Sequence, residues 1–216
     1  MEARNITLRF GGLEALNGLS FAVDPGQIVS LIGPNGAGKT TLLNVITGVY
    51  SLDSGEILFR GSPISRLRTY QIAGLGIHRT FQQSQLFHDL TALENVALPT
   101  IFSTNSAREK GYERAEELME MVGLKEKITA YPRQLSAGQQ QRLVVARALL
   151  NQPEVLLADE PTSDLDEQTE TEIMELFKGI HDRSGITIVL VTHSSGLVSY
   201  GTRSVKMAAG RILEES

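Results

Sequence analysis

The sequence contains no cysteine, no long apolar run and no excess of basic residues. Without cysteine among its 216 residues, the chain forms neither a disulfide nor a cysteine-ligated metal site, which fits a reducing cytosol. No apolar stretch approaches the ~18 residues that suggest a membrane span, so we expect any membrane role to need a partner. The first residues, MEARNITLRF, lack the apolar region of a signal peptide. The net charge of -5 argues against a basic nucleic-acid-binding surface.

The chain does contain an alternation of apolar, strand-like runs and helical patterns. The runs IVSLI, VLLA and ITIVLV are each followed by a segment with helical periodicity. This alternation predicts one α/β domain with a mainly parallel sheet. Residues 89–150 differ, because they have helical periodicity and no strong strand. We therefore expect a helical insert at 89–150 between two parts of the core, 1–88 and 151–216.

One helix of the insert has an ordinary amphipathic pattern. In SAREKGYERAEELMEMVGL, four apolar residues follow the i, i+3, i+4, i+7 spacing: Ala115, Leu118, Met119 and Val122. The other face of this segment is charged. The pattern predicts a surface helix that packs through one stripe, and we assign its charges no function.

Residues 33–40, GPNGAGKT, fit the phosphate-loop pattern G-x-x-x-x-G-K-[ST]. The strand-like QIVSLI precedes the loop and the helical TTLLNVITG follows it, which argues against a chance glycine-rich turn. Glycines let backbone amides approach an anion closely, and these amides and the helix N-terminus surround the phosphates. We expect Lys39 to reach the β- and γ-phosphates and the Thr40 hydroxyl to ligate Mg²⁺. The nucleotide-contacting candidates here are Gly33, Pro34, Asn35, Gly36, Ala37, Gly38, Lys39, Thr40 and Thr41.

Two carboxylates close a second buried run, VLLADE, at residues 155–160. Asp159 is suited to hold Mg²⁺, directly or through water, and Glu160 to act as general base toward the attacking water. Pro161 favours an extended backbone at Glu160, which would aim its side chain out of the strand end. An acidic pair that merely begins a solvated turn is common, and the phosphate loop upstream is what favours the catalytic interpretation.

Three further residues are weak signals on their own. Gln82, in HRTFQQSQLF, is a candidate for contact with Mg²⁺ or the attacking water. His193 closes the run ITIVLVT and is suited to bond a γ-phosphate or to orient Glu160 and its water. Phe10, which lies 23 residues before Gly33, could stack on a base. Taken alone, each has an ordinary alternative as a solvated glutamine, a structural histidine and a core aromatic.

Taken in order, these segments resemble the ATP-binding-cassette (ABC) ATPases over nearly the whole chain. GPNGAGKT is similar to the phosphate loop of that family, the glutamine of RTFQ to its Q-loop, and LSAGQQQR to its signature, usually LSGGQ. VLLADE is similar to its acidic strand, SDLD to its D-loop and VTH to its switch histidine. Phe10 falls where the family carries its adenine-stacking aromatic.

The resemblance implies a P-loop NTPase core with a mainly parallel sheet, an N-terminal antiparallel β part and a helical subdomain. It also implies ATP and Mg²⁺ as cofactors and ATP hydrolysis as the activity. The implied metal ligands are Thr40, Gln82 and Asp159. The implied catalytic residues are Glu160, His193 and Gln82.

The signature stretch, residues 135–142, is a polar segment directly before the apolar run LVVARALL. Ser136 is suited to cap the helix that begins there, and a helix N-terminus with free amides is an anion site. By the resemblance, two subunits pair head to tail around two ATP molecules, as a homodimer or a cassette heterodimer. The signature of one subunit then contacts the γ-phosphate held by the other. The signature residues implied to act in this way are Ser136, Ala137, Gly138 and Gln139.

Ala137 departs from the family pattern, which usually has glycine at this place. Its amide remains available to a phosphate. The added methyl costs up to about 1 kcal/mol if the backbone there needs a glycine-like conformation, and very little if φ is ordinary.

A single cassette without a membrane span resembles the detached ATPase subunit of an ABC transporter. We expect it on the cytoplasmic face of the inner or plasma membrane, bound to integral membrane permease subunits through residues 83–98, QSQLFHDLTALENVAL. The alternative is a soluble ABC ATPase that acts on nucleic acid or ribosomes. The single cassette, the absence of a coiled-coil insert and the acidic charge balance disfavour it, so we expect no nucleic-acid partner. A third alternative, a P-loop small-molecule kinase, does not explain the signature.

The two halves of the chain point to different cargoes. FGGLEALNGLSF and GIHRTFQQSQLFHDLTALENV look like cassettes of branched-chain amino-acid importers. VLLADEPTSDLDEQT and the short ending after VTHSSG look like cassettes of lipoprotein-release and macrolide-efflux systems. The sequence therefore favours neither import nor export.

Overall fold

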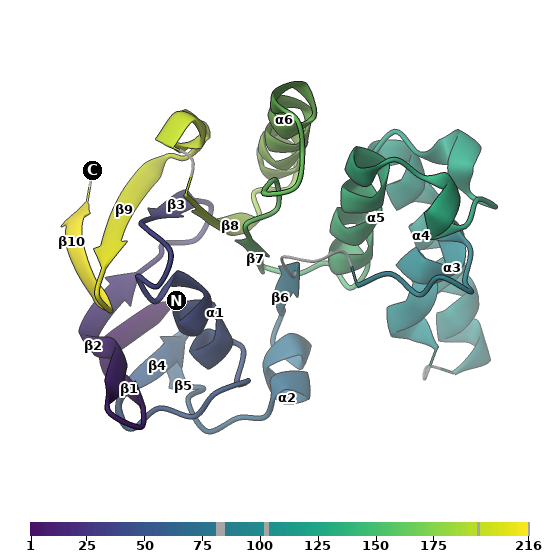
Figure 1. Ribbon diagram of the computed structural model, residues 1–216. Coiled ribbons are helices and arrows are strands. Elements are labelled where there is room, and N and C mark those ends of the chain that lie inside the picture. The colour runs from purple at the N-terminus through teal and green to yellow at the C-terminus, as the bar shows by residue number, and fades with distance from the viewer. Residues whose placement is uncertain (81–84, 102–103, 194, 216) are drawn as a thin grey trace. The chain divides into compact units, whose positions relative to one another are not determined.

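The computed structural model describes residues 1–80, 85–101, 104–193 and 195–215, and Figure 1 shows their helices and strands. The chain forms two compact units, which we call the core unit and the helical unit. The core unit comprises Met1–Arg79, Glu154–Glu160 and Lys178–Ser216, and the helical unit comprises Thr80–Pro153 and Pro161–Phe177. The helical unit thus also holds residues outside 89–150, and the boundaries 89 and 150 stay a prediction.

The core unit contains a six-stranded sheet. Its strands lie in the order β10 (Arg211–Glu215), β9 (Arg203–Ala208), β3 (Ile28–Ile32), β8 (Thr187–Thr192), β7 (Val155–Asp159) and β6 (Ile77–Thr80). β3 pairs in parallel with β8 and β9, and β7 pairs in parallel with β8, whereas β10 pairs antiparallel with β9. Strands β7 and β8 are buried along their whole length, as their unbroken apolar runs require of a sheet covered on both faces. The predicted mainly parallel sheet is confirmed.

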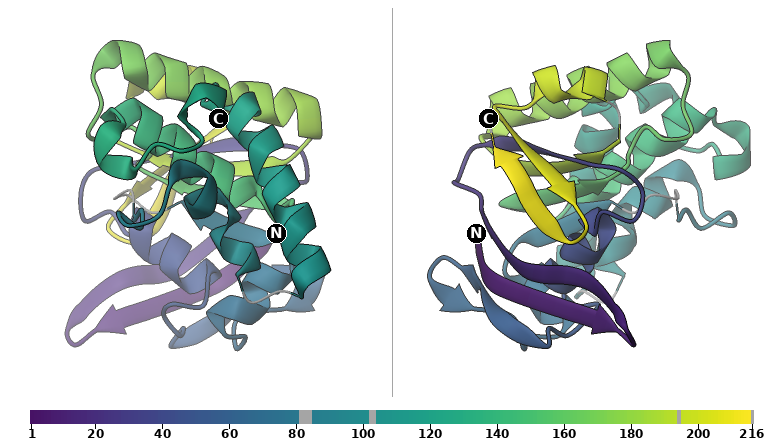
Figure 2. Two further views of the ribbon diagram at one scale, coloured as in Figure 1. Left: turned by 90° about the vertical axis from the view of Figure 1, so that its right-hand side faces the viewer. Right: turned by 60° about the vertical axis from the view of Figure 1, so that its left-hand side comes forward.

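A second, four-stranded sheet is antiparallel and forms the predicted N-terminal β part. Its order is β2 (Leu13–Ala22), β1 (Glu2–Phe10), β4 (Ser54–Phe59) and β5 (Ser62–Pro63). In β2, Leu16 and Leu19 are buried, whereas Gly18 and Ser20 are not, which is typical of a sheet with one face on the core. The two sheets meet where the Asn17 amide donates to the Gly210 carbonyl at 3.0 Å, beside the β9–β10 hairpin (yellow in Figure 2).

Helix α1 (Lys39–Ile46) packs into the apolar core that both sheets share. Its residues Leu42, Leu43 and Ile46 are buried together with side chains of β1, β3 and β7. The short helix α2 (Thr69–Gly74) and the 3₁₀ turn Ser195–Tyr200 complete the helical elements described in this unit, apart from the end of α6. Because α1 is packed on both sheets, the loop that leads into it is held at the C-terminal edge of β3.

The helical unit contains α3 (Ala92–Ala97), α4 (Asn105–Met121), α5 (Ala137–Leu149) and the first part of α6 (Glu167–Ser184). Helices α3, α4 and α5 pack on one another, and the 3₁₀ turns are Leu98–Thr100, Lys125–Lys127 and Pro132–Gln134. The four apolar residues predicted to form one stripe are all buried, namely Ala115, Leu118, Met119 and Val122. Across the described residues, the helices are all too short or too polar to pass through a bilayer.

Candidate functional site

The phosphate loop joins β3 to α1, as the sequence predicts. Helix α1 begins after Gly38, which has a left-handed φ of 98°, and no side chain caps this end. A Cβ on Gly38 would lie 2.6 Å from the Ala15 carbonyl oxygen, and one on Gly33 would lie 2.2 Å from that of Met207. These glycines therefore let the loop pass close to β2 and β9. The uncapped amides at the N-terminus of α1 form an anion-binding arrangement.

Lys39 lies inside this loop with its side chain buried. Its Nζ donates to the carbonyl oxygens of Gly33 (2.7 Å) and Pro34 (3.2 Å) and lies 3.8 Å from Glu160 Oε1. A buried ammonium is costly unless anions and hydrogen-bond acceptors surround it. The loop therefore presents a desolvated positive charge next to backbone amides, which favours a phosphate as ligand.

Asp159, the last residue of β7, faces Thr40 at the start of α1. Thr40 Oγ1 donates to Asp159 Oδ1 at 3.2 Å, and the aspartate side chain is 1% exposed. A hydroxyl and a carboxylate oxygen fit Mg²⁺, which prefers oxygen ligands and keeps several waters. No cluster of three His, Cys, Asp or Glu residues suited to a metal occurs within the described part of the chain, so this fit depends on the Thr40–Asp159 pair. Gln82 lies outside the described residues, and its roles stay predictions.

Glu160 lies between Lys39 and His193. Its Oε2 is 3.5 Å from His193 Nδ1, and its side chain is 11% exposed, whereas that of His193 is 56% exposed. Strand pairing explains this meeting, because β7 and β8 run in parallel and Asp159 is the register partner of Val191. Residues that follow these two strands therefore arrive at the same edge of the sheet. The structure thus brings together the predicted phosphate loop, acidic pair and histidine in one unit.

The expectation of an extended backbone at Glu160 is wrong. Its φ is 44°, which lies in the left-handed region. The Glu160 amide donates to the Val191 carbonyl at 2.9 Å, so the chain stays bonded to β8 while it turns out of the sheet. That bond outweighs the preference set by Pro161, at a cost of about 1–2 kcal/mol for a non-glycine residue. Strained backbone is concentrated at functional sites, and Glu160 is the residue that the sequence predicts to be the general base.

Phe10 ends β1 and is 45% exposed, so burial of this aromatic in the core is excluded. Phe10 is the register partner of Leu13, at the start of β2. Leu16, three residues further along β2, packs beside Gly38 of the phosphate loop, because its Cδ2 would lie 3.3 Å from a Cβ added to that glycine. The exposed ring of Phe10 is therefore only a few residues along the β1–β2 hairpin from a contact with the phosphate loop. Whether it stacks on a base stays a prediction.

Two residues beside the site drew no sequence prediction. Arg79 of β6 pairs with Asp159 at 2.6 Å, with only 6% of its side chain exposed. Tyr50, which follows α1, packs edge-on against Phe10, with ring centroids 5.2 Å apart and an interplanar angle of 75°. The sequence does show Arg79 as a charged residue inside a short strand and Tyr50 as an aromatic soon after the phosphate-loop helix. Neither feature indicates which residue it contacts, because Asp159 and Phe10 are distant in sequence.

The signature stretch lies at the start of α5 in the helical unit. Ser136 Oγ accepts a bond from the Gln139 amide (3.3 Å), and Gln139 Oε1 accepts one from the Ser136 amide (3.0 Å). This is a capping box, so the predicted cap is confirmed. Ala137 is exposed and its φ is not positive, so its methyl causes no backbone strain. Gly138, in contrast, is buried, and a Cβ there would lie 2.4 Å from Thr169 Cγ2.

Comparisons with known proteins agree with this geometry. The family model described as "ABC transporter" matches residues 16–163. An uncharacterized ABC transporter ATP-binding protein of Thermotoga maritima is 45% identical over 93% of this chain and 86% of its own length. The lipoprotein-releasing system ATP-binding protein LolD of Bacteroides thetaiotaomicron is 38% identical over 100% of both chains. The likeness to lipoprotein-release cassettes, predicted from the C-terminal half, thus extends over the whole chain. The likeness of the N-terminal half to branched-chain importers stays a prediction.

A solved structure of a dimeric ATP-binding cassette, bound to ADP and Pi after hydrolysis, superposes with a TM-score of 0.86. It is 35% identical, and the match covers 100% of this chain and 97% of that chain. The fold, the order of the motifs and these matches all point the same way. The chain therefore belongs to the ABC transporter family and is one of its ATP-hydrolysing cassettes.

Proposed function

We propose that the chain binds Mg²⁺ and ATP in the core unit and hydrolyses the ATP to drive a membrane transporter. One observation carries the assignment of the site: the phosphate loop, the Thr40–Asp159 pair and the Glu160–His193 pair lie at the C-terminal ends of the parallel strands β3, β7 and β8. The names of the relatives, ABC transporter ATP-binding protein and LolD, support the transport role. They give no support to action on nucleic acid.

Phosphate binding falls to the loop amides and to Lys39, whose ammonium already lies among the loop carbonyls. Thr40 and Asp159 would hold Mg²⁺, with Gln82 as a further ligand, and the bound metal neutralises phosphate charge. Phe10 would stack on the base with the open part of its ring.

Catalysis falls to Glu160 as the general base toward water, with His193 as its orienting partner. Lys39 Nζ lies 3.8 Å from Glu160 Oε1. A bound phosphate would also attract the Lys39 ammonium, and we propose that Glu160 then accepts a proton from the attacking water. His193 then keeps Oε2 in place and donates toward the γ-phosphate. The strained backbone of Glu160 keeps the carboxylate at this edge of the sheet.

A second copy of the chain completes the site. The Ser136–Gln139 end of α5 is a helix N-terminus outside the core unit, and it carries no lysine or arginine of its own. Such an end contributes hydrogen bonds to a phosphate that another loop already holds. The dimeric cassette with ADP and Pi supports this arrangement. We therefore propose a dimer in which Ser136, Ala137, Gly138 and Gln139 contact the ATP of the partner.

Membrane subunits would dock on the helical unit near residues 83–98, at the cytoplasmic face of the membrane. A hollow of about 450 Å³ there is lined by His88, Asp89, Tyr131 and Arg133. Phe87 (55% exposed) and Tyr131 (46% exposed) present aromatic rings, which are enriched in protein interfaces together with arginine. An Arg133→Glu variant should lose co-purification with membrane permease subunits. Unchanged co-purification would move the docking surface elsewhere.

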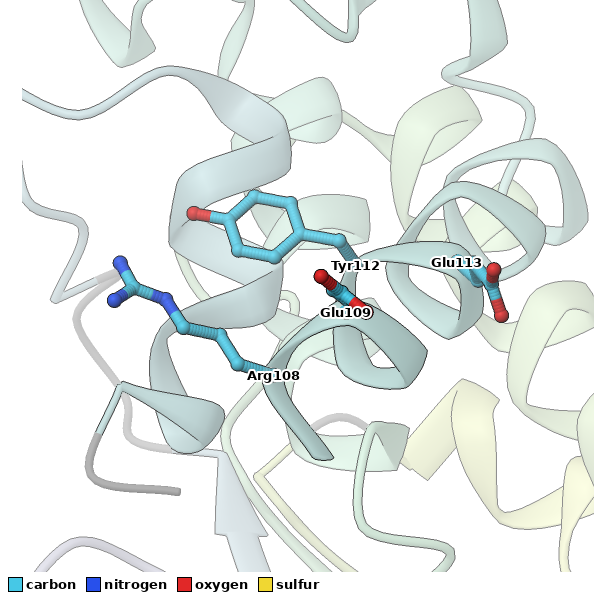
Figure 3. A pocket seen from close by; sticks show the side chains of 4 residues that line it. All are labelled: Arg108, Glu109, Tyr112 and Glu113. Atoms are coloured by element: carbon cyan, nitrogen blue, oxygen red, sulfur yellow. The ribbon is translucent and has the colours of Figure 1, made fainter. Parts of the chain in front are cut away.

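A second surface of the helical unit lies along α4 and extends this region. A hollow of about 500 Å³ is lined by Arg108, Glu109, Tyr112 and Glu113, whose side chains are drawn in Figure 3. Arg108 and Tyr112 project to the same side in this view, and both also line a smaller hollow of about 90 Å³ with Leu90 and Leu98. We propose that the docking surface extends from residues 83–98 onto one face of α4.

Nucleotide binding tests the site directly. Lys39→Ala removes the buried ammonium, and ATP affinity should fall by on the order of 100-fold, because charge-assisted bonds to phosphate are lost. Fluorescence titration with an ATP analogue measures this. Lys125→Ala is the matched control, because Lys125 is exposed and pairs with the surface carboxylate of Glu120. Equal affinities of the Lys39→Ala variant and the parent would remove the phosphate-loop assignment.

Turnover and dimerisation test the catalytic role. Glu160→Gln keeps the shape of the side chain but not the base, so hydrolysis should fall about 10²- to 10⁴-fold while ATP binding persists. Size-exclusion chromatography in Mg-ATP should then show a dimer. Glu175→Gln, at an exposed position of α6, is the control for loss of a surface charge. A monomer under these conditions would contradict the two-subunit site.

A further inference from the structure

We propose that Arg79 is a positioning residue that serves as the resident counter-ion of Asp159. In this role it keeps the carboxylate from recruiting Mg²⁺ until a nucleotide brings the metal. The inference rests on the proposed role of Thr40 and Asp159 in holding Mg²⁺. It adds to that role a residue that sets when the metal binds.

The Arg79 guanidinium is held at both ends of its fork. Its Nη2 pairs with Asp159 Oδ2 at 2.6 Å, and its Nη1 donates to Asn44 Oδ1 at 2.6 Å. Asn44 belongs to α1 and Asp159 to β7, so the planar group bridges the phosphate-loop helix and the acidic strand. The side chains of Arg79 and Asp159 are 6% and 1% exposed, respectively, so solvent screens this pair very little. A lysine keeps the charge but not the fork.

The two oxygens of Asp159 have separate partners. Oδ1 accepts the Thr40 hydroxyl, and Oδ2 accepts Arg79. Asp159 Oδ1 is therefore the oxygen that faces Thr40 Oγ1, and these two oxygens would hold Mg²⁺ together. By fixing Oδ2, Arg79 orients the carboxylate so that Oδ1 stays toward Thr40. This arrangement differs from an ordinary surface ion pair, in which both oxygens remain free to rotate in water.

Charge balance gives Arg79 its second effect. Lys39 and Glu160 lie 3.8 Å apart, and Arg79 and Asp159 lie 2.6 Å apart, so each of these two carboxylates has a resident cation in the core unit. The formal charges of Arg79 and Asp159 cancel within their own buried pair. A free Mg²⁺ ion therefore meets no net attraction there and is repelled by the nearby guanidinium. The phosphates of ATP supply the negative charge that draws the metal in.

The test measures metal binding in the absence of nucleotide. Electron paramagnetic resonance gives the Mn²⁺ affinity of each variant. The unfolding temperature of each variant is measured in MgCl₂ and in NaCl of equal ionic strength. The parent should show no Mg²⁺-specific stabilisation. Arg79→Gln should melt at a lower temperature in NaCl, gain stability with Mg²⁺, and bind Mn²⁺ at least about ten-fold tighter, because the repulsion is gone and a carboxylate is unpaired.

Three further variants make the test specific. Arg79→Lys keeps the positive charge and should keep the weak Mn²⁺ affinity of the parent. In the double variant Arg79→Gln/Asp159→Asn, the Mg²⁺-dependent gain should vanish. Arg142→Gln is the matched control, since it breaks a 2.7 Å ion pair with Glu172 in the helical unit and should gain no metal response.

The outcomes separate this inference from the proposed function. Parental Mn²⁺ affinity in folded Arg79→Gln overturns the counter-ion role. If Arg79→Gln does not fold, the double variant Arg79→Gln/Asp159→Asn decides. If the double variant folds, the defect of Arg79→Gln is the uncompensated buried charge of Asp159, which supports the counter-ion role; if the double variant does not fold either, that role is overturned. Asp159→Asn alone should lose the Mg²⁺-dependent part of ATP binding. If that part persists, the proposed metal site falls, and the inference on Arg79 falls with it.

Discussion

The chain has two helix N-termini that are proposed to meet the same kind of phosphate, and they are built in opposite ways. Helix α1 follows a left-handed glycine, Gly38, has no side-chain cap, and begins with the buried Lys39. Helix α5 follows the exposed Ser136, whose hydroxyl oxygen already accepts a bond from the Gln139 amide. The first end has uncapped amides beside a cation, an arrangement suited to bind an anion alone. At the second end one amide is already bonded to Ser136, and we propose that this end only adds contacts to an anion held by another loop.

The glycines of the two stretches also differ in how strictly the structure requires them. Gly38 is required twice, by a φ of 98° and by backbone of β2 that a Cβ would strike. Gly138 is required once, by the methyl of Thr169 on α6, and its φ is not positive. A backbone constraint admits no other residue, whereas a side-chain constraint is relieved by changing the side chain. The phosphate loop is therefore expected to tolerate far less change than the signature.

The largest expected effect is that of Gly38→Ala. The added Cβ would lie 2.6 Å from the Ala15 carbonyl oxygen in a backbone conformation that alanine rarely adopts. We expect a loss of about 3 kcal/mol or more in unfolding free energy, together with loss of ATP binding. Gly36→Ala is the matched control, because its φ is 80° but its Cβ would meet nothing within 4 Å. Urea denaturation of both variants gives the answer, and equal stability would remove the steric argument.

Gly138→Ala should have a smaller effect, and a reversible one. Its Cβ would meet Thr169 Cγ2 at 2.4 Å, so we expect a loss of about 1–3 kcal/mol. Thr169→Ser removes that methyl but keeps the hydroxyl bond to Asp166, which is 2.7 Å long. The double variant Gly138→Ala/Thr169→Ser should therefore recover most of the stability, measured against Thr169→Ser alone. Failure of the serine to rescue would mean that something other than this contact makes alanine unfavourable.

The sequence predicts most of this comparison because both stretches are local. GPNGAGKT and LSAGQQQR each contain their own turn and helix start, so Gly38 and Ser136 could be assigned from neighbouring residues alone. His193 and Glu160 could be brought together as well, because each follows a strand of a parallel sheet. Such strands end at one edge of that sheet.

Contacts that depend on which strands are neighbours were not predictable in the same way. Arg79 meets Asp159 because β6 lies beside β7, and nothing within β6 reveals that order. Tyr50, which follows α1, packs on Phe10 at the end of β1, and neither residue indicates this contact from its own neighbours in sequence. The left-handed φ of Glu160 has the same origin, since the bond to Val191 on β8 overrides the local preference set by proline. Long-range pairing, not composition, decides these features.

Ser136 tests whether the cap of α5 and its role toward phosphate are separable. Ser136→Ala removes the acceptor for the Gln139 amide, and unfolding free energy should fall by about 1 kcal/mol. Ser136→Asp keeps an acceptor, so stability should stay close to that of the parent. Its negative charge would nevertheless repel the phosphate of a partner, and in a Glu160→Gln background it should weaken ATP-dependent dimerisation. Undiminished dimerisation of that variant would argue that the Ser136 end of α5 does not meet a phosphate.

Ala137→Gly has the smallest expected effect, and it completes the comparison. Ala137 is exposed at the first position of α5, and its φ is not positive, so glycine gains no conformational advantage there. Glycine is less favourable than alanine in a helix by up to about 1 kcal/mol, and the cost is smaller at a first turn. We expect a slight loss of stability. In a Glu160→Gln background, sedimentation in Mg-ATP should give an unchanged dimer constant. A dimer tightened several-fold by glycine would show that the methyl stands between the α5 amides and the partner's phosphate, and the signature would then resemble the phosphate loop in requiring a bare backbone.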